Sequence, residues 1–127
     1  HGFVTNMSEW MAASDLIVSK AGPGTIAEAL IRGLPIVLSG FLPGQEAPNV
    51  RFVTDAGVGA FSRDPETIAE IVAEWLACPD ALEARARRAR SLGRPNATYE
   101  IVREIAALSP SLVAEQAFAG PVMERNM

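Results

Sequence analysis

Residues 16–33 read LIVSKAGPGTIAEALIRG. The first four form a compact apolar run of the kind that is buried on both faces of a sheet. A glycine-rich turn follows, and the apolar spacing then becomes that of a helix, which we expect to stop at Gly33. A buried strand that passes through a small-residue turn into a helix is typical of a parallel sheet covered by helices. We therefore predict an α/β fold.

The rest of the chain repeats this alternation of short apolar runs and helical periods. We predict a first strand that ends at Phe3-Val4, and further strands at residues 34–38 and 58–61. Helices are expected near residues 6–13, 49–56, 64–77 and 79–92, and a last helix is expected to carry Tyr99, Val102, Ile105 and Ala106 on one face. No internal repeat is visible.

The predicted helix at residue 64 has the strongest local signals. Asp64, Pro65 and Glu66 supply a cap, a proline at the first position and an acid in the first turn. Five apolar residues at helical spacing predict one buried stripe: Ile68, Ile71, Val72, Trp75 and Leu76. Cys78 follows this stripe, so we expect a buried, inert thiol. A single cysteine excludes an intramolecular disulfide and a cysteine-based zinc site.

Composition narrows the class of protein. The 127 residues are 49% hydrophobic and 20% charged, which fits one ordered domain and excludes a disordered chain. The net charge of −4 argues against a nucleic-acid partner. Five arginines crowd into one short stretch: Arg85, Arg87, Arg88, Arg90 and Arg94. They fit either a solvated helix face or a surface attracted to anionic lipid headgroups.

The turn at residues 20–25 is the central candidate for a binding site. A helix N-terminus presents unpaired N–H groups and partial positive charge, which attract an anion. Gly22 and Gly24 let the backbone approach a phosphate, and Thr25 adds a hydroxyl donor. The turn also lies beyond the carboxyl end of a strand, where ligands bind in open α/β sheets. A tight strand-to-helix turn needs small residues anyway, so the turn alone leaves a purely structural role open.

Two further sets of polar residues each allow a structural and a ligand-binding interpretation. Glu28 is spaced from Thr25 as in a capping box, or its carboxylate accepts hydrogen bonds from ribose hydroxyls. Pro43-Gly44-Gln45-Glu46, with Asn49 beyond, is either a polar surface loop or a set of groups that bind sugar hydroxyls. The spacing of these residues does not decide between the readings.

Several motifs in order resemble one enzyme family. They are GFVTNM at 2–7, KAGPGTIAEA at 20–29, GLP at 33–35, PGQE at 43–46, VAEW at 72–75 and the break at Arg94-Pro95. Together they resemble the C-terminal half of monogalactosyldiacylglycerol synthases, relatives of the UDP-N-acetylglucosamine transferase of peptidoglycan assembly. The resemblance covers about residues 2–108, and nothing after Pro110 takes part in it.

The resemblance implies a fold and a set of ligand contacts. The fold would be the C-terminal half of GT-B, a Rossmann-like parallel sheet with flanking helices, and we expect its first strand–helix–strand unit to be missing. By position, Phe3 and Val4 would border the uracil and Glu28 would hold the ribose. The diphosphate would contact Gly22, Pro23, Gly24 and Thr25. The hexose would contact Gln45, Glu46 and Asn49.

The resemblance also implies which part of the whole enzyme binds the donor and which part supplies the catalytic base. Residues 1–109 would form a partial UDP-sugar-binding domain and residues 110–127 a tail. No catalytic residue is assigned, because the family's base lies in the N-terminal domain, and His1 is read as a bystander. The implied reaction moves a hexose, with galactose favoured, to diacylglycerol or a related lipid, without a cofactor or metal. UDP-glucose, UDP-N-acetylglucosamine and a non-catalytic binding module stay open as alternatives.

The sequence also bears on where the protein is located in the cell. The start of the chain does not read as a signal peptide, and no apolar run reaches the roughly 20 residues that cross a bilayer. A chain that begins at His1, almost within a predicted strand, suggests a fragment. We expect a cytoplasmic protein peripheral to the inner face of a membrane, or to the chloroplast envelope if it comes from a plant.

Overall fold

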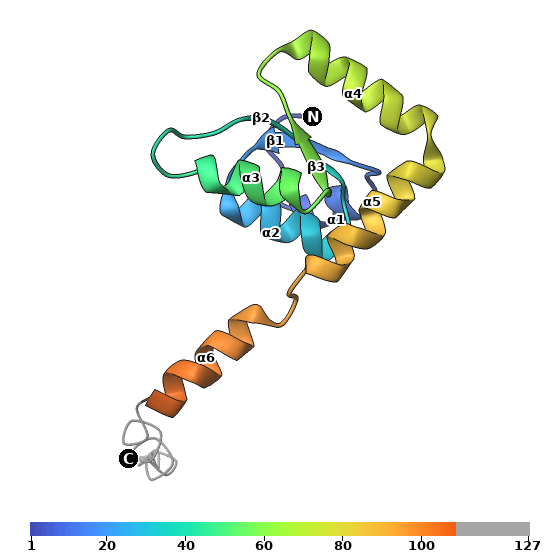
Figure 1. Cartoon of the computed structure of the whole chain (residues 1–127). Helices are drawn as coiled ribbons and strands as arrows, with labels where there is room; N and C mark the ends of the chain where they lie inside the picture. Colours follow the sequence, from blue (N-terminus) through green and yellow to red (C-terminus); the bar gives the residue numbers. More distant parts are fainter. Residues whose placement is uncertain (109–127) are drawn as a thin grey trace, which may run out of the picture. The chain divides into compact units, whose positions relative to one another are not determined.

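The computed structural model describes residues 1–108. The chain divides into two compact units, residues 1–94 and a second unit that starts at Pro95. The predicted tail at 110–127 lies outside the described residues. In chain order the first unit contains α1 (Met7–Ala12), β1 (Ile17–Lys20), α2 (Pro23–Arg32), β2 (Ile36–Gly40), α3 (Ala47–Asp55), β3 (Gly59–Phe61), α4 (Pro65–Ala77) and α5 (Pro79–Leu92) (Figure 1). The second contains α6 (Ala97–Leu108).

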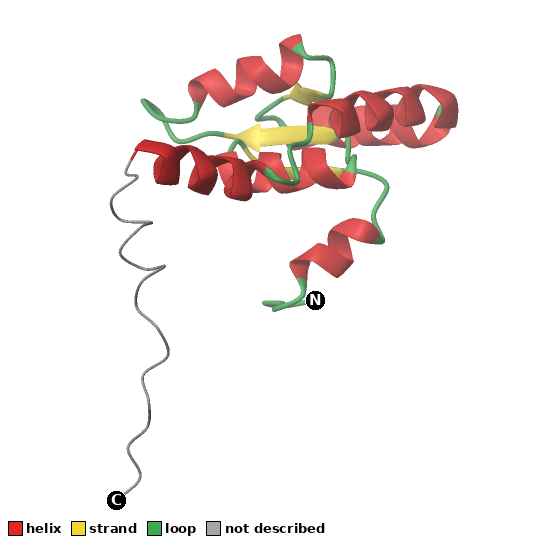
Figure 2. Cartoon of the chain, turned by 90° about the horizontal axis from the view of Figure 1, so that it is seen from below, coloured by secondary structure: helices red, strands yellow, loops and turns green. Residues whose placement is uncertain are grey.

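The sheet of the first unit has three parallel strands in the order β1-β2-β3. The helices α2 and α3 each connect one strand to the next in the same direction, so right-handed crossovers place both on one face. The helix α4 also contacts β2, and helices lie on both sides of the strands (Figure 2). The predicted Rossmann-like α/β fold is therefore confirmed.

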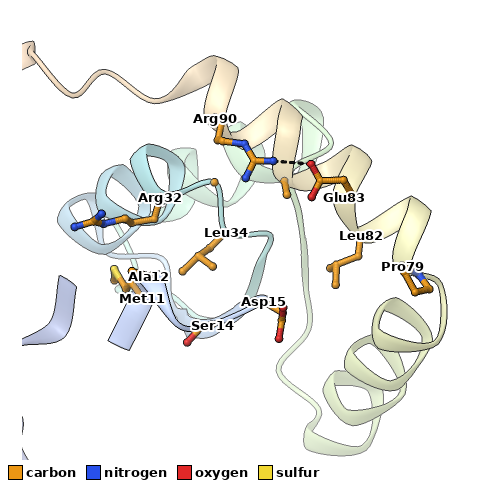
Figure 3. Close-up of a pocket in the computed structure, with 12 residues that line it drawn as sticks. Met11, Ala12, Ser14, Asp15, Arg32, Leu34, Pro79, Leu82, Glu83 and Arg90 are labelled. Carbon is orange, nitrogen blue, oxygen red and sulfur yellow. Dashed lines mark hydrogen bonds and ion pairs between the residues drawn. The ribbon is translucent and has the colours of Figure 1, made fainter. Parts of the chain in front are cut away.

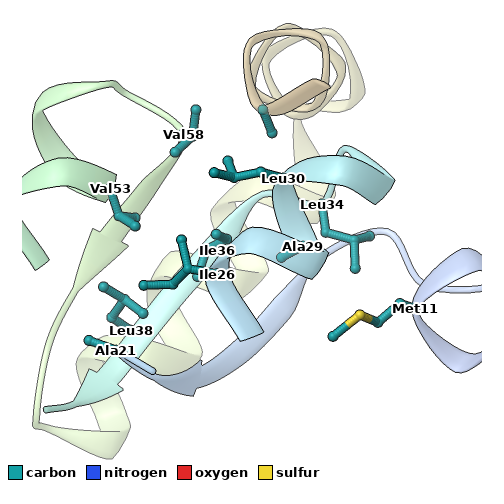
Figure 4. Close-up of a cluster of buried hydrophobic side chains, with 11 residues drawn as sticks. Met11, Ala21, Ile26, Ala29, Leu30, Leu34, Ile36, Leu38, Val53 and Val58 are labelled. Carbon is teal, nitrogen blue, oxygen red and sulfur yellow. The ribbon is translucent and has the colours of Figure 1, made fainter. Parts of the chain in front are cut away.

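The core forms where α2 and α3 cover β2. Ile36 and Leu38 of β2 pack with Ile26 and Leu30 of α2 and with Val53 of α3 (Figure 4). These side chains share one face of the sheet because residues two apart on a strand point the same way. All five are buried. This packing fixes α2 against the sheet, and with it the turn that opens α2.

The start of the chain differs from the prediction. Phe3 and Val4 form no strand, and the side chain of Phe3 is 98% exposed. The strand expected at residues 16–19 does form, as β1, but it is not buried on both faces. Val18 is 45% exposed. The reason is topological, since β1 is the first strand of the sheet order and Val18 does not face the core helices.

Predictions for α4 are confirmed at its start and wrong at its end. The Asp64 carboxylate caps the helix by accepting the Thr67 N–H at 2.9 Å. Trp75 is buried, but Leu76 is 53% exposed. Cys78 is also exposed, because it occupies the break between α4 and α5, beyond the covered part of the stripe.

The described part of the second unit contains one helix, α6. The predicted last helix is confirmed as α6, and Tyr99, Val102, Ile105 and Ala106 fall on one face of it by helical spacing. None of the described helices combines the length and the apolar character that a membrane crossing requires.

Candidate functional site

The turn between β1 and α2 is open. Gly22 caps α2 in an extended conformation, with φ −71° and ψ 131°, and Pro23 takes a first-turn position where no N–H is lost. Within residues 1–108, no hydrogen bond of the structure uses the N–H of Gly24 or of Thr25. A Cβ added to Gly24 would meet no heavy atom within 4 Å. Gly24 is exposed, so among the described residues two backbone donors at the positive end of α2 are left without a protein partner.

Three hydrogen bonds hold the backbone of the turn in place. The Ala21 N–H donates to the Gly40 carbonyl at 2.8 Å, and the Gly22 N–H donates to the Lys20 carbonyl at 2.8 Å. The side-chain amide of Asn49 donates to the Ala21 carbonyl at 2.9 Å. The last bond gives Asn49 a structural role beside the sugar contact expected of it. The turn is therefore preorganised before any ligand arrives.

An ion pair joins the turn to the loop before α3. The ammonium Nζ of Lys20 lies 2.6 Å from Oε1 of Glu46, and the N–H of Leu42 donates to Oε2 at 2.8 Å. The side chain of Glu46 is only 9% exposed, against 66% for Lys20. The hydrogen bond from Lys20 and the one from Leu42 hold the pKa of Glu46 below its ordinary value. Sequence reasoning gave Lys20 no role, although it is the only lysine in the chain.

The remaining sequence-predicted residues are spread more widely. Glu28 is exposed on α2 and borders a cavity of about 230 Å³ that Ser8 and Met11 of α1 also line. The capping-box reading of Glu28 is wrong, because the N-cap of α2 is Gly22. Gln45 is exposed beside Glu46. Phe3 and Val4 precede α1 and take no part in the core cluster or in the hydrogen bonds of the turn.

Thus the structure brings together only part of the expected set. Gly22, Pro23, Gly24 and Thr25 form the turn, and two residues of the 43–49 segment, Glu46 and Asn49, are bonded to it. Glu28 follows one helical turn later. This arrangement offers anion-binding donors at its centre and polar side chains around them.

The larger cavities lie elsewhere. One of about 420 Å³ is lined by Ser14 and Asp15 before β1, by Leu34 before β2, and by residues of α5 that include Glu83 and Arg90 (Figure 3). It therefore borders the amino ends of the strands, opposite the edge where ligands bind in such sheets. Another of about 550 Å³ lies between β3, α4 and α5. Neither contains a residue of the turn.

The arginine run is tied into the fold to a greater extent than a solvated face requires. Arg88 donates to the Gly57 carbonyl at 2.9 Å, and Arg85 lies over the ring of Trp75 at 4.5 Å. Arg90 pairs with Glu83 at 2.6 Å, and Arg87 approaches the same carboxylate at 3.6 Å. Within residues 1–108, no group of three or more His, Cys, Asp or Glu side chains is placed to hold a metal ion.

Comparisons with known proteins show which family the chain matches. A family model described as the glycosyltransferase family 28 C-terminal domain matches residues 1–101. Monogalactosyldiacylglycerol synthase 2, chloroplastic, of Arabidopsis thaliana is 50% identical over 109 residues, which cover 85% of this chain and 23% of that protein. Probable monogalactosyldiacylglycerol synthase 3, chloroplastic, of Oryza sativa subsp. japonica is 52% identical over 110 residues, covering 85% and 22%.

A solved structure shows the same fold. The crystal structure of MurG from Acinetobacter baumannii superposes with a TM-score of 0.71 at 26% identity, covering 83% of this chain and 32% of that one. The chain spans less than a quarter of the length of the two plant proteins.

Proposed function

Because this chain belongs to the glycosyltransferase family 28 C-terminal domain family, we propose that it is the donor-binding part of a UDP-sugar-dependent glycosyltransferase. The whole enzyme would move a hexose, with galactose favoured, to diacylglycerol or a related lipid. Relatives at 50–52% identity that are named as monogalactosyldiacylglycerol synthases support this donor and acceptor. UDP-glucose and UDP-N-acetylglucosamine stay as the alternative donors that the sequence resemblance implies.

One observation carries the proposal: within residues 1–108 the N–H groups of Gly24 and Thr25 at the start of α2 have no hydrogen-bond partner, and Gly24 is exposed. As the bond between sugar and diphosphate breaks, negative charge builds on the β-phosphate. Fixed N–H dipoles and the positive helix end stabilise that charge without reorganising. The proposal invokes no cofactor, since these donors meet the charge of the leaving group.

The surrounding side chains would bind the rest of the donor. Glu28, exposed one helical turn after Thr25, would accept hydrogen bonds from the ribose, and the exposed amide of Gln45 would contact the hexose. The acceptor site and the catalytic base would lie in the part of the enzyme that this chain does not span. The ring of His1 packs against that of Trp10 in a tilted arrangement, with centroids 4.4 Å apart, which gives it a packing role.

A lipid acceptor also implies contact with a membrane, and we propose peripheral association as for an envelope enzyme. The Arg87 side chain is 65% exposed and its partner Glu83 is 3.6 Å away, so it is the member of the arginine run best placed to meet anionic headgroups. Co-sedimentation with phosphatidylglycerol vesicles should fall in Arg87→Gln and stay unchanged with phosphatidylcholine. Equal sedimentation of both proteins would contradict the membrane contact.

The donor site can be blocked without disturbing the fold. A leucine at Gly24 would extend into open space and should not lower stability, since Leu is the better helix former by somewhat under 1 kcal/mol. It would nevertheless occupy the position of the diphosphate. We expect NMR titration to show at least a tenfold loss of UDP affinity in Gly24→Leu, and none in the control Ala27→Leu on the exposed face of the same helix.

Parallel titrations would identify the sugar. UDP-galactose should bind more tightly than UDP-glucose and UDP-N-acetylglucosamine, and the opposite order would reject the favoured donor. If Gly24→Leu bound UDP as well as the unaltered chain, the anion site itself would be refuted.

A further inference from the structure

The only lysine of the chain stands at an irregularity of the sheet. Ser19 of β1 pairs with Leu38, but Lys20 pairs with Gly40, so β2 carries one extra residue at this point. Such bulges re-aim the neighbouring side chain and are frequent beside functional sites. Here the Lys20 ammonium nitrogen lies 3.1 Å from the position that a Cβ on Gly22 would take. The ammonium therefore lies against the turn whose N–H donors are open.

Glu46, the partner of Lys20, limits where the ammonium charge can lie. Glu46 is buried and accepts from both the Lys20 ammonium and the Leu42 N–H, so its two oxygens are already engaged. A buried carboxylate needs such partners to offset its lost hydration. The carboxylate lies inside and the ammonium lies outside, with side chains 9% and 66% exposed. An approaching anion would therefore meet the ammonium first.

The ammonium also has donors to spare. A lysine carries three N–H donors, and the contact with Glu46 uses one of them. Bonds from a charged donor to phosphate oxygens are shorter and stronger than neutral ones. A lysine held in one place also loses less conformational freedom when it binds than one that moves freely.

We propose that Lys20 is a further donor-binding residue that contacts the diphosphate, and that Glu46 is a positioning residue that holds it there. Through the Leu42 N–H, Glu46 also couples the 42–46 loop, which contains Gln45, to the diphosphate turn. This inference rests on the proposed function. It changes the role expected of Glu46, which would act on the diphosphate through Lys20 rather than by contact with the hexose.

Ligands that differ in their number of phosphates distinguish a Lys20 that binds the diphosphate from a Lys20 that only supports the fold. We would titrate the 127-residue chain with uridine, UMP and UDP, and compare Lys20→Met and Lys20→Arg. Lys20→Met should weaken UDP about tenfold and uridine less than twofold, and Lys20→Arg should restore most of the loss. If Lys20 only supported the fold, Lys20→Met would lower the affinities for all three ligands by the same factor. Equal losses for uridine and UDP, or no loss for UDP, would overturn the role of Lys20.

Glu46 has a second test, which compares ligands with and without the hexose. Glu46→Gln should weaken UDP and UDP-galactose by the same factor, since both carry the diphosphate. A loss confined to UDP-galactose would instead show direct hexose binding and overturn the positioning role. Urea unfolding would check that each variant folds, and the Lys20 series carries the test if Glu46→Gln does not. Failure of the unaltered chain to bind UDP would refute the proposed function; a loss in Gly24→Leu without one in Lys20→Met would refute this inference alone.

Discussion

A single residue, Gly33, fixes the end of α2. Gly33 ends α2 with φ +74°, and a Cβ there would overlap the side chain of Arg90 from α5. Gly33→Ala should therefore lower the free energy of unfolding by about 2–4 kcal/mol, from the left-handed backbone and the crowding together. Urea unfolding would measure the change.

Gly44 is the matched control for this prediction. It has φ +82°, and a Cβ there would meet nothing within 4 Å. Gly44→Ala should cost only the backbone contribution, about 1–2 kcal/mol. Equal losses at the two positions would mean that Arg90 moves aside without cost.

A second prediction at this scale concerns pH. The pKa of Glu46 lies below its ordinary value of 4.5, because the folded state bonds the carboxylate to Lys20 and to Leu42. A carboxyl whose pKa is lower in the folded state stabilises the fold above the unfolded pKa, and the benefit is lost as pH falls through the folded pKa. The urea midpoint should therefore decrease below about pH 4.5, and decrease less in Glu46→Gln.

Asp64 also has a lowered pKa, so part of the acid sensitivity should persist in Glu46→Gln. Glu70→Gln, at an exposed position of α4, should leave the profile unchanged. A pH profile of Glu46→Gln that matched the unaltered chain would show that the Glu46 carboxylate adds nothing to stability.

These residues also show which contacts a sequence reveals. The cap at Asp64 and the stop at Gly33 are local, so neighbouring residues predict them. The pair of Lys20 and Glu46 joins positions 26 residues apart, and the bond from Asn49 to Ala21 joins positions 28 apart. No local pattern encodes such pairs, so the sequence predicted where the turn lies but not the bonds that hold it to the 42–49 segment.

Among the elements, α5 depends on its arginines for docking. Arg88 donates to the carbonyl of Gly57, the left-handed glycine that follows α3. Replacing Arg88 with Met should lower the free energy of unfolding by about 1–2 kcal/mol, because the carbonyl loses a charged donor. Arg87→Met is the control: within residues 1–108 the Arg87 guanidinium pairs only with Glu83, at 3.6 Å, so the change should alter stability by less than about 0.5 kcal/mol. Thermal unfolding of the two variants would compare them, and equal shifts would contradict a docking role for Arg88.

The sequence predicted where helices form more accurately than which of their faces are buried. The stripe of α4 was expected to be buried along its length, but Leu76 is exposed because α4 stops at Ala77 and the chain turns into α5. Cys78 is exposed at the same break. The strand β1 was expected to be covered on both faces, and its place in the strand order decides otherwise. Burial depends on what packs against an element, which periodicity alone does not contain.

At the scale of the whole molecule, the candidate donor site belongs to one unit. Its turn, the Lys20–Glu46 pair and the bond from Asn49 all lie within residues 1–94. So does the core cluster, which runs from Met11 to Ala89. Among the described residues, those that pack α2 against the sheet and bond to the turn all precede Pro95.

A chain ended after Arg94 should therefore fold and bind UDP as the full chain does. The core cluster and the hydrogen bonds of the turn are formed by residues before Pro95, so removing residues 95–127 should cost the first unit little stability. Urea unfolding would measure that cost, and NMR titration with UDP should give dissociation constants within twofold of each other. A shortened chain with dispersed amide signals but weakened UDP binding would show that residues after Arg94 complete the site. A collapsed spectrum would show that the first unit is not independent.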